Sequence, residues 1–408
     1  MSAYTGYLIR KTRMEKNLSQ EGLAKGICAS SYLSKIEKGT AEPESEIIDR
    51  LFAALGIEFV RDPALEDEAQ RQLDRFFFLY EAQQPHDEQD AFFAQNGGRL
   101  ERSGFALAYH VQRLCTAADR GQVEAAQALR ARIEPFLPCM EEKLRQRALC
   151  AMADVADTTL ESLELFKRAA LLGPSCVVEM GLALCMNRMG QYEQSMETCE
   201  RAFSLACEQG NPYVMIYSSF LMGTNACDRY DLGLAQRYYS KAIALSRGYA
   251  KSYEDYASYN LGATYLEIGR EEEAFAWMKK THEMDDDPHH NMMLHQKLTI
   301  LYAGRGETQC AAEHLAQARV WLQEAKKVTG YGAALYEKMI DFAGMLIGPQ
   351  AKRSPEYERL LLELYEQTAN TFSHSFSQFY GRYLIEHYKS QRRYKDALRV
   401  REEIDRLS

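Results

Sequence analysis

The chain has 408 residues, of which 46% are hydrophobic and 26% are charged, and its net charge is −9. The length exceeds one ordinary domain, and the composition is that of a soluble, well-packed globular protein. No apolar run approaches the roughly 18 residues of a membrane-spanning helix, and the charged N-terminus lacks the apolar core of a secretory signal, so we expect a cytoplasmic protein without membrane contact.

The N-terminal 60 residues are predicted to form short helices. A first helix covers residues 4–16, and a later one ends at Gly56. Between them, the segment LSQEGLAKGICASSYLSKIEKGT holds two short helices joined through a turn at Gly26. This arrangement is typical of a helix-turn-helix, whose second helix enters the DNA major groove. We therefore predict a five-helix DNA-binding domain over residues 1–60, followed by a linker over residues 61–67.

The charge of this N-terminal segment is unlike that of the whole chain. Residues 1–40 carry seven Lys or Arg and three acidic residues, a net charge of +4, whereas residues 41–60 carry −4. A basic face on an acidic body can still neutralise phosphates where it touches them. Small helical bundles of this kind also serve as protein docking domains, but DNA binding is the favoured interpretation.

Residues 68–408 show helical patterns without strand patterns. Turns follow one another about 20 residues apart, at Gly97-Gly98, Gly121, Gly173-Pro174, Gly190, Gly210-Asn211-Pro212, Gly269, Gly304-Arg305-Gly306, Gly330 and Gly348-Pro349. This spacing suggests stacked helix pairs, and the clearest unit, Asn260–Met278, resembles the tetratricopeptide pattern. The corresponding anchor residues of successive units lie 40, 39 and 37 residues apart, at Ser195, Ala235, Ala274 and Ala311. We predict an all-α protein whose C-terminal part is an α-solenoid with a concave face.

Motifs for catalysis and for cofactors are not found in the sequence. It has no Walker loop, HExxH or GxSxG motif, and none of its ten cysteines forms a CxxC pair, so we expect neither an enzyme nor a cofactor. A metal site could be suspected at Asp285, Asp286, Asp287, His289, His290 and His295. Three consecutive acids beside Pro288 are more typical of a solvated turn, and we expect no metal there.

The two parts together resemble a known family. Residues 7–57 resemble the XRE/Cro-like helix-turn-helix family, and the fusion to repeats of about 40 residues resembles the RRNPP peptide-pheromone receptors of Gram-positive bacteria. The XRE/Cro-like resemblance implies DNA contacts by Gln20, Ser30, Ser31, Tyr32, Ser34, Lys35, Lys38 and Thr40. It also implies that Glu37 forms a structural ion pair with Arg13. The usual Ser or Thr cap of the second helix is Ala29 here, which would move the cap to Ser30.

The family resemblance further implies an oligopeptide in the concave face. An extended peptide has unpaired backbone N–H and C=O groups, and Asn side chains can donate to and accept from them. The candidate peptide-binding residues are Asn260, Asn225, Asn187, Tyr217, Tyr256, Tyr259, Gln296 and Arg382.

The sequence thus predicts a homodimeric transcriptional regulator that binds an operator in double-stranded DNA and is controlled by a short signalling oligopeptide. The alternative is a tetratricopeptide interaction module that acts on a partner protein of the response-regulator kind. The intact helix-turn-helix pattern argues against this alternative as the main role.

Overall fold

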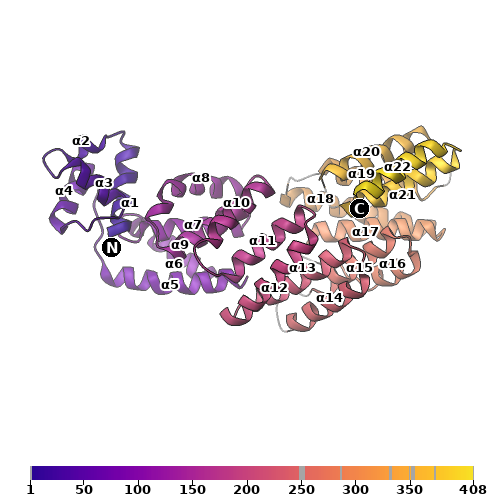
Figure 1. The fold of residues 1–408 in the computed structure, drawn as a ribbon, viewed down its shortest axis with the longest axis horizontal. Coiled ribbons are helices and arrows are strands. Elements are labelled where there is room, and N and C mark those ends of the chain that lie inside the picture. Colours follow the sequence, from indigo (N-terminus) through magenta and orange to yellow (C-terminus); the bar gives the residue numbers. More distant parts are fainter. Residues whose placement is uncertain are drawn as a thin grey trace. The chain divides into compact units, whose positions relative to one another are not determined.

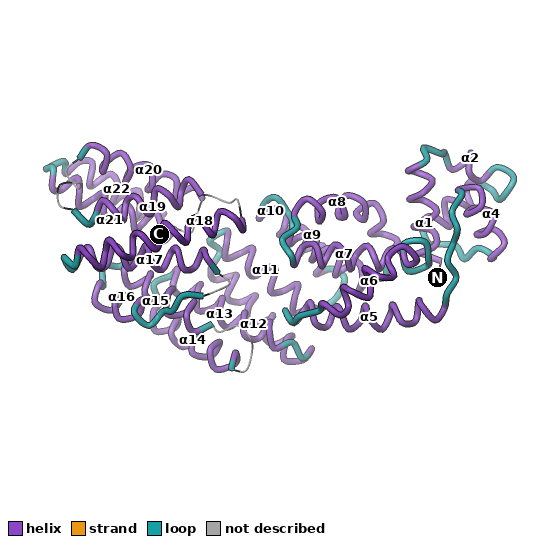
Figure 2. Tube along the Cα trace, turned by 180° about the vertical axis from the view of Figure 1, so that it is seen from behind, coloured by secondary structure: helices purple, strands orange, loops and turns teal. Residues whose placement is uncertain are grey.

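The computed structural model describes residues 2–247, 253–284, 287–329, 333–348, 350, 354–371 and 374–407. These residues are α-helical apart from one 3-10 helix, η1, and loops, with no strand among them (Figure 2). They fold as two compact units, which we treat separately: unit 1 is Met1–Cys185 with Arg201–Val214, and unit 2 is Met186–Glu200 with Met215–Ser408. The predicted all-α class is confirmed.

Figure 1 labels the α-helices in chain order. Ten of them, together with η1, belong wholly to unit 1. They are α1 (Ser2–Glu15), α2 (Gln20–Ala24), α3 (Ser30–Glu37), α4 (Ser45–Leu55), α5 (Pro63–Glu81), α6 (Asp87–Leu100), α7 (Ala106–Asp119), α8 (Val123–Ile133), η1 (Glu134–Cys139), α9 (Glu142–Asp154) and α10 (Thr159–Ala170). The division between the units runs through α11 (Cys176–Arg188), α12 (Tyr192–Gln209) and α13 (Pro212–Asp228).

The remaining helices belong to unit 2. They are α14 (Leu232–Ser246), α15 (Glu254–Glu267), α16 (Glu271–Met278), α17 (Pro288–Gly304), α18 (Thr308–Thr329), α19 (Ala333–Met345), α20 (Pro355–Thr371), α21 (His374–Ser390) and α22 (Tyr394–Leu407). Asp285, Asp286, Gly330 and Pro349, which the sequence predictions named, lie outside the described residues.

The helix-turn-helix is made by α2 and α3, packed on α1 and α4. Ser19 caps α2 by accepting a hydrogen bond from the backbone N–H of Gly22, and Gly26 takes a φ of 74° in the turn. The prediction of five helices was wrong: residues 2–60, all described, hold four. Pro63 starts α5 and Asp62 caps it, so residues 63–67 of the expected linker are helical.

Unit 1 holds α1 firmly against later helices. Tyr7 is fully buried, with its ring edge-on to those of Phe136 and His110. Lys11 forms an ion pair of 3.3 Å with Glu101. These contacts from α7, η1 and the end of α6 join the helix-turn-helix to the helices behind it by packing as well as by the chain.

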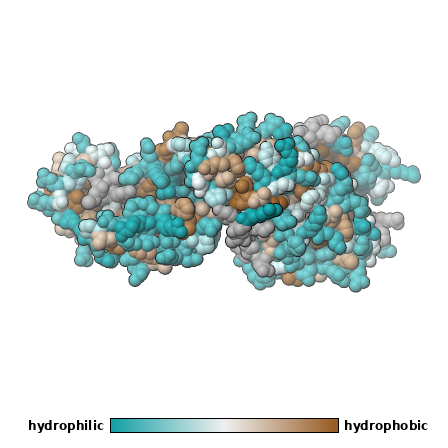
Figure 3. Space-filling view, turned by 90° about the horizontal axis from the view of Figure 1, so that it is seen from below, coloured by the Kyte–Doolittle hydropathy of each residue, from teal (hydrophilic) through white to brown (hydrophobic). Residues whose placement is uncertain are grey.

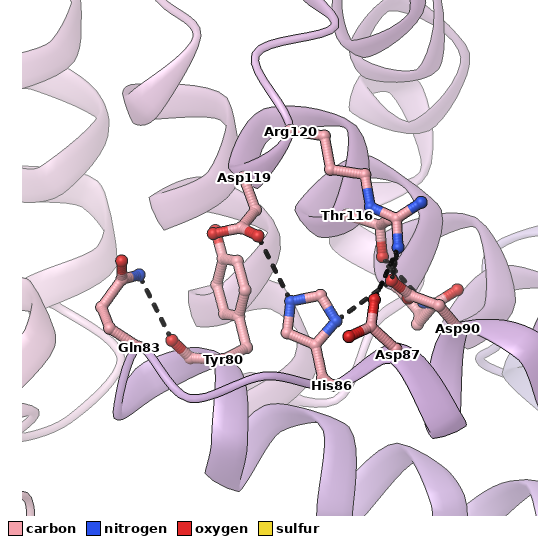
Figure 4. A network of polar contacts seen from close by, with 9 residues as sticks. Tyr80, Gln83, His86, Asp87, Asp90, Thr116, Asp119 and Arg120 are labelled. Carbon is pink, nitrogen blue, oxygen red and sulfur yellow. Dashed lines mark hydrogen bonds and ion pairs between the residues drawn. The ribbon is translucent and has the colours of Figure 1, made fainter. Parts of the chain in front are cut away.

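A buried polar network fixes the α5–α6 loop to α7 (Figure 4). The ring of His86, 7% exposed, lies between carboxylates: Nδ1 is 3.1 Å from Asp90 and Nε2 is 3.4 Å from Asp119. Asp90 also accepts hydrogen bonds from Thr116 and Arg120. We interpret this network as structural, because it joins the loop before α6 to the end of α7.

Helix pairing dominates the repeats of unit 2. Close contacts join α15 with α16, α17 with α18, and α21 with both α20 and α22. Small residues allow helices to approach closely: a Cβ at Gly262 of α15 would press on Met278 of α16, and one at Gly223 of α13 would overlap the ring of Tyr239 of α14. Gly269 ends the first helix of its pair with a φ of 79°. The predicted solenoid of helix pairs is confirmed in these residues.

One predicted turn was wrong. Gly97 and Gly98 lie inside α6. A Cβ at Gly97 would overlap the hydroxyl of Tyr109, so this glycine lets α6 approach α7 closely instead of breaking the helix.

On the face shown in Figure 3, hydrophilic surface predominates and hydrophobic surface forms small separate patches. No helix of the described residues is long and apolar enough to cross a membrane.

Candidate nucleic-acid interface and peptide-binding face

The outer side of α3 is open to solvent. Its apolar residues Leu33 and Ile36 are fully buried, which turns the opposite side of the helix outward. Of the predicted DNA contacts, Ser30, Ser31, Lys35, Lys38 and Thr40 are exposed, and Gln20, Tyr32 and Ser34 are partly exposed. The structure therefore gathers the predicted contacts on and beside one exposed helix.

The start of α3 differs from the expectation. Ala29 is the N-cap, in extended conformation and without a side-chain hydrogen bond, so the cap does not move to Ser30. Ser30 and Ser31 are the first two residues of the helix, where backbone N–H groups have no partner within the helix. A phosphate or a base edge at this end can meet both the hydroxyls and those N–H groups.

A buried ion pair holds α3 in place. Arg13 donates from Nε and Nη2 to the two oxygens of Glu37, at 2.6 and 2.9 Å, which confirms the predicted pair. Gln20 donates to the same carboxylate at 2.7 Å. The amide of Gln20 is therefore partly used to orient Glu37, a structural role that the sequence did not reveal.

Two other predicted contacts also have partners within the domain. The Thr40 hydroxyl donates to the carbonyl of Lys35 at 3.2 Å, and the Tyr32 hydroxyl reaches the carbonyl of Glu42 at 3.4 Å. Both bonds shape the segment after α3. Lys35 and Lys38 are exposed and form no ion pair with any residue that the structure describes, so their ammonium groups can meet an external anion.

In unit 2, the first helix of each pair carries the predicted peptide contacts. We call the surface made by α13, α15, α17 and α21 the inner face. Here α15 contacts both α17 and α21, and Arg382 of α21 donates to the carbonyl of Glu267 at 3.0 Å. Residues more than 100 positions apart in sequence thus meet on the inner face.

The predicted asparagines differ in their surroundings. Asn225 is 0% exposed, accepts from Asn187 at 2.9 Å and donates to Ser195 at 2.9 Å. Both ends of its amide are thus used inside the protein. Asn260 is partly exposed and donates to the hydroxyl of Tyr239 at 3.0 Å, and its carbonyl oxygen has no hydrogen bond within the described residues. Asn260 is therefore better placed than Asn225 to accept from a peptide N–H.

The other predicted residues line the same helices. Tyr256 donates to Asp287 at 2.7 Å, and the rings of Tyr256 and Tyr259 both lie edge-on to His290. Tyr217 stacks on Phe220. Gln296 is fully buried and donates to the carbonyl of Met339, while its Oε1 has no partner within the described residues.

Three ionisable residues of the inner face were missed by the sequence reasoning. Burial raises the pKa of Asp228 and of Glu267 to about 7, and burial lowers the pKa of Lys297 to about 8. Lys297 is 1% exposed, with Nζ 4.3 Å from the ring centre of Phe379 and no hydrogen-bond partner within the described residues. Asp228 and Glu267 lie 39 residues apart, the spacing of Ala235 and Ala274, and this repeat position was the available signal.

These charges are poorly compensated inside the protein. In the part of the chain that is described, no carboxylate lies within 4.0 Å of the Lys297 or Arg382 side chains. Taking an ion out of water costs several kcal/mol, whereas a cation–π contact returns about 0.5–2 kcal/mol. The buried charge of Lys297 is thus compensated only in part by the described residues.

The buried acids should make stability depend on pH. As the pH rises from about 4 to 7, Asp228 ionises in the unfolded chain while it stays protonated in the folded one, so the free energy of unfolding falls. A pKa of about 7 in place of 3.8 corresponds to at most about 4 kcal/mol, and partial solvent contact reduces this. We expect Asp228→Asn to stabilise the chain by about 1–2 kcal/mol at pH 8 and little at pH 4. Urea unfolding at both pH values measures this, and equal effects would contradict it.

Described residues offer no group of three or more His, Cys, Asp or Glu side chains that could hold a metal ion. Asp287 caps α17 by accepting from the backbone N–H of His290. His295 bonds Glu283 and His314. The side chains of the suspected segment that are described thus have local structural partners.

Known proteins resemble both the helix-turn-helix and the helical repeats of this chain. Residues 9–61 match the family model HTH_3, helix-turn-helix. No curated protein sequence matches the chain. Among solved structures, a Rap protein complexed with competence and sporulation factor is similar over 84% of this chain and 98% of its own, with a TM-score of 0.65 and 14% identity.

NprR is similar as well. The apo form of this quorum sensor from B. thuringiensis has a TM-score of 0.58 at 10% identity, and NprR in complex with its cognate peptide NprX has 0.59 at 10%. Each match covers 84% of this chain and 99% of NprR. The chain therefore joins a helix-turn-helix domain of the HTH_3 family to helical repeats with the fold of Rap and of the quorum sensor NprR, the architecture that the RRNPP resemblance implied.

Proposed function

We propose that the protein is a cytoplasmic, homodimeric transcriptional regulator that binds operator DNA through α3 and responds to a short oligopeptide bound on the inner face. The observation that carries the proposal is the exposed side of α3, held by the buried Arg13–Glu37 pair. A dimer would place two such helices in adjacent half-sites about 34 Å apart. No catalytic role is needed in this proposal.

The peptide part of the proposal has separate support. NprR, whose fold the repeats share, was solved with its cognate peptide. In this chain the inner face presents Asn260, whose side-chain carbonyl oxygen accepts no hydrogen bond from the described residues. A peptide that favours one arrangement of the repeats would shift the equilibrium between DNA-binding states.

Lys35 should be the main reading residue. A lysine that reaches guanine O6 or N7 discriminates one base pair, so Lys35→Ala should weaken specific binding by about 1–3 kcal/mol and relax the preference at one position. Gel shifts of the full chain on DNA upstream of its gene measure this, with Lys143→Ala, an exposed lysine of α9, as control. An unchanged sequence preference would remove Lys35 from the reading set.

Asn260→Ala should abolish the effect of a bound peptide on DNA binding and leave the fold and basal DNA binding intact. Asn225→Ala is the matched contrast, because it breaks two buried hydrogen bonds and should mainly lower stability. DNA binding with and without a random heptapeptide pool tests both variants. A normal peptide effect in Asn260→Ala would exclude this residue from the site.

The same gel shift separates DNA binding from a role in binding a partner protein alone. Counterion release makes DNA binding weaken steeply with salt. A wild-type chain that gives no salt-sensitive, sequence-dependent shift would favour the partner-protein role.

A further inference from the structure

The inner face holds a buried cation, Lys297, whose ammonium group has no hydrogen-bond partner within the described residues. Lys297 of α17 and Arg382 of α21 have no carboxylate within 4.0 Å in the described chain. Lys297 lies against Phe379 and Phe376, 4.3 and 5.4 Å from the ring centres. Native structures rarely leave a buried ammonium group without a hydrogen-bond acceptor, so this one requires an explanation.

The nearby acidic residue, Glu267, does not supply the missing acceptor. Glu267 of α15 is close enough to influence Lys297 electrostatically, yet it forms neither a hydrogen bond nor an ion pair with it. Burial raises the pKa of the Glu267 carboxyl to about 7, so close to neutral pH it is only partly ionised. The cationic pair of Lys297 and Arg382 is therefore not cancelled by its acidic neighbour.

Two more buried polar groups of α17 and α21 lack partners in the described part of the chain. Gln296 Oε1 and the Tyr380 hydroxyl have none within the described residues. Arg382 is partly exposed and uses one N–H on the carbonyl of Glu267. Arg382 is close enough to act electrostatically on Lys297, and the flexible four-carbon stem of Lys297 can carry its ammonium group toward Arg382.

We propose that Lys297 and Arg382 together receive a carboxylate of the bound peptide, so that the ligand is a peptide with a free C-terminal carboxyl or an acidic side chain. This inference rests on the proposed peptide-binding function. A carboxylate has the geometry for an N–H pair of a guanidinium and accepts from an ammonium group as well. It would supply the acceptor that Lys297 lacks.

The test uses the full chain and pools of random heptapeptides made without Asp and Glu, one with C-terminal acids and one with C-terminal amides. A third pool contains Asp and Glu and has C-terminal amides. Peptide that co-elutes with the protein is measured by mass spectrometry. We expect the wild-type chain to retain the acid pool at least tenfold more than the first amide pool, which would identify the C-terminal carboxyl. Preferential retention of the third pool would identify an acidic side chain.

Lys297→Met should reduce retention of the preferred pool to that of the amide pool made without Asp and Glu. It removes an unpartnered buried charge, so its melting temperature should not fall. Lys297→Arg should keep the preference, and Lys280→Met, an exposed lysine of α16, should not change it. An unchanged preference in Lys297→Met, or equal retention of all pools by the wild type, overturns the inference alone. Retention of no pool by the wild type overturns the proposed peptide binding as well.

Discussion

Replacing Arg13 by alanine should lower the free energy of unfolding of the helix-turn-helix by about 3–5 kcal/mol, because it leaves a buried carboxylate without its cation. Glu37 is 2% exposed and receives two of its three side-chain hydrogen bonds from Arg13. The third hydrogen bond comes from the amide of Gln20, which is uncharged and cannot neutralise the carboxylate. Since Glu37 ends α3, loss of the pair should also disturb the exposed face.

The double variant Arg13→Met, Glu37→Leu should lose much less than Arg13→Ala, because neither charge remains. Urea unfolding of the full chain, with hydrogen exchange followed at the amides of α3, measures both. Arg71→Ala, which breaks an exposed pair with Glu68, is the control and should have little effect. If the double variant is at least as destabilised as Arg13→Ala, the pair is not buried as described.

Gly6→Ala should destabilise the same part of the chain by about 3 kcal/mol. Gly6 lies where α1 crosses α3, and a Cβ there would overlap the backbone carbonyl oxygen of Ile36. Backbone cannot rotate away as a side chain can, so α3 must move off α1. Specific DNA binding should therefore fall together with stability.

Gly98→Ala is the matched control, because Gly98 lies inside α6 and a Cβ there would have no neighbouring atom of the described residues within 4 Å. It should stabilise the chain by about 0.5–1 kcal/mol, since alanine is the better helix former. Thermal unfolding with hydrogen exchange at α1 and α3 distinguishes the two. A Gly6→Ala variant as stable as Gly98→Ala would show that α1 and α3 are not in this contact.

The helix-turn-helix could be predicted from sequence because its signals are local. The apolar spacing, Gly26 and the Ser19 cap act within a few residues. The predicted number of helices was wrong because the helix that starts at Pro63, α5, packs against α6 and α7 and is not part of the N-terminal domain. Gly97-Gly98 was misread for a similar reason: a glycine pair is typical of a turn, but here Tyr109 from another helix requires the small residue.

The candidate peptide face was predicted only in part. The repeat period placed Asn260 and Arg382 on first helices, where the structure has them. It could not show that α21 meets α15, since the closure of a solenoid depends on small rotations summed over several pairs. Lys297 was overlooked for this reason, because its aromatic neighbours come from α21. Asn225 was chosen by residue type, although its amide has both partners within the protein.

Selection of bound duplexes from a random DNA library by the full chain tests the central claim most directly. The account predicts one enriched motif with two half-sites about one helical turn apart, binding that weakens steeply with salt, and loss of preference at a symmetric pair of positions in Lys35→Ala. Recovery of no motif, or the same motif from wild type and Lys35→Ala, would contradict the claim that the exposed side of α3 reads DNA.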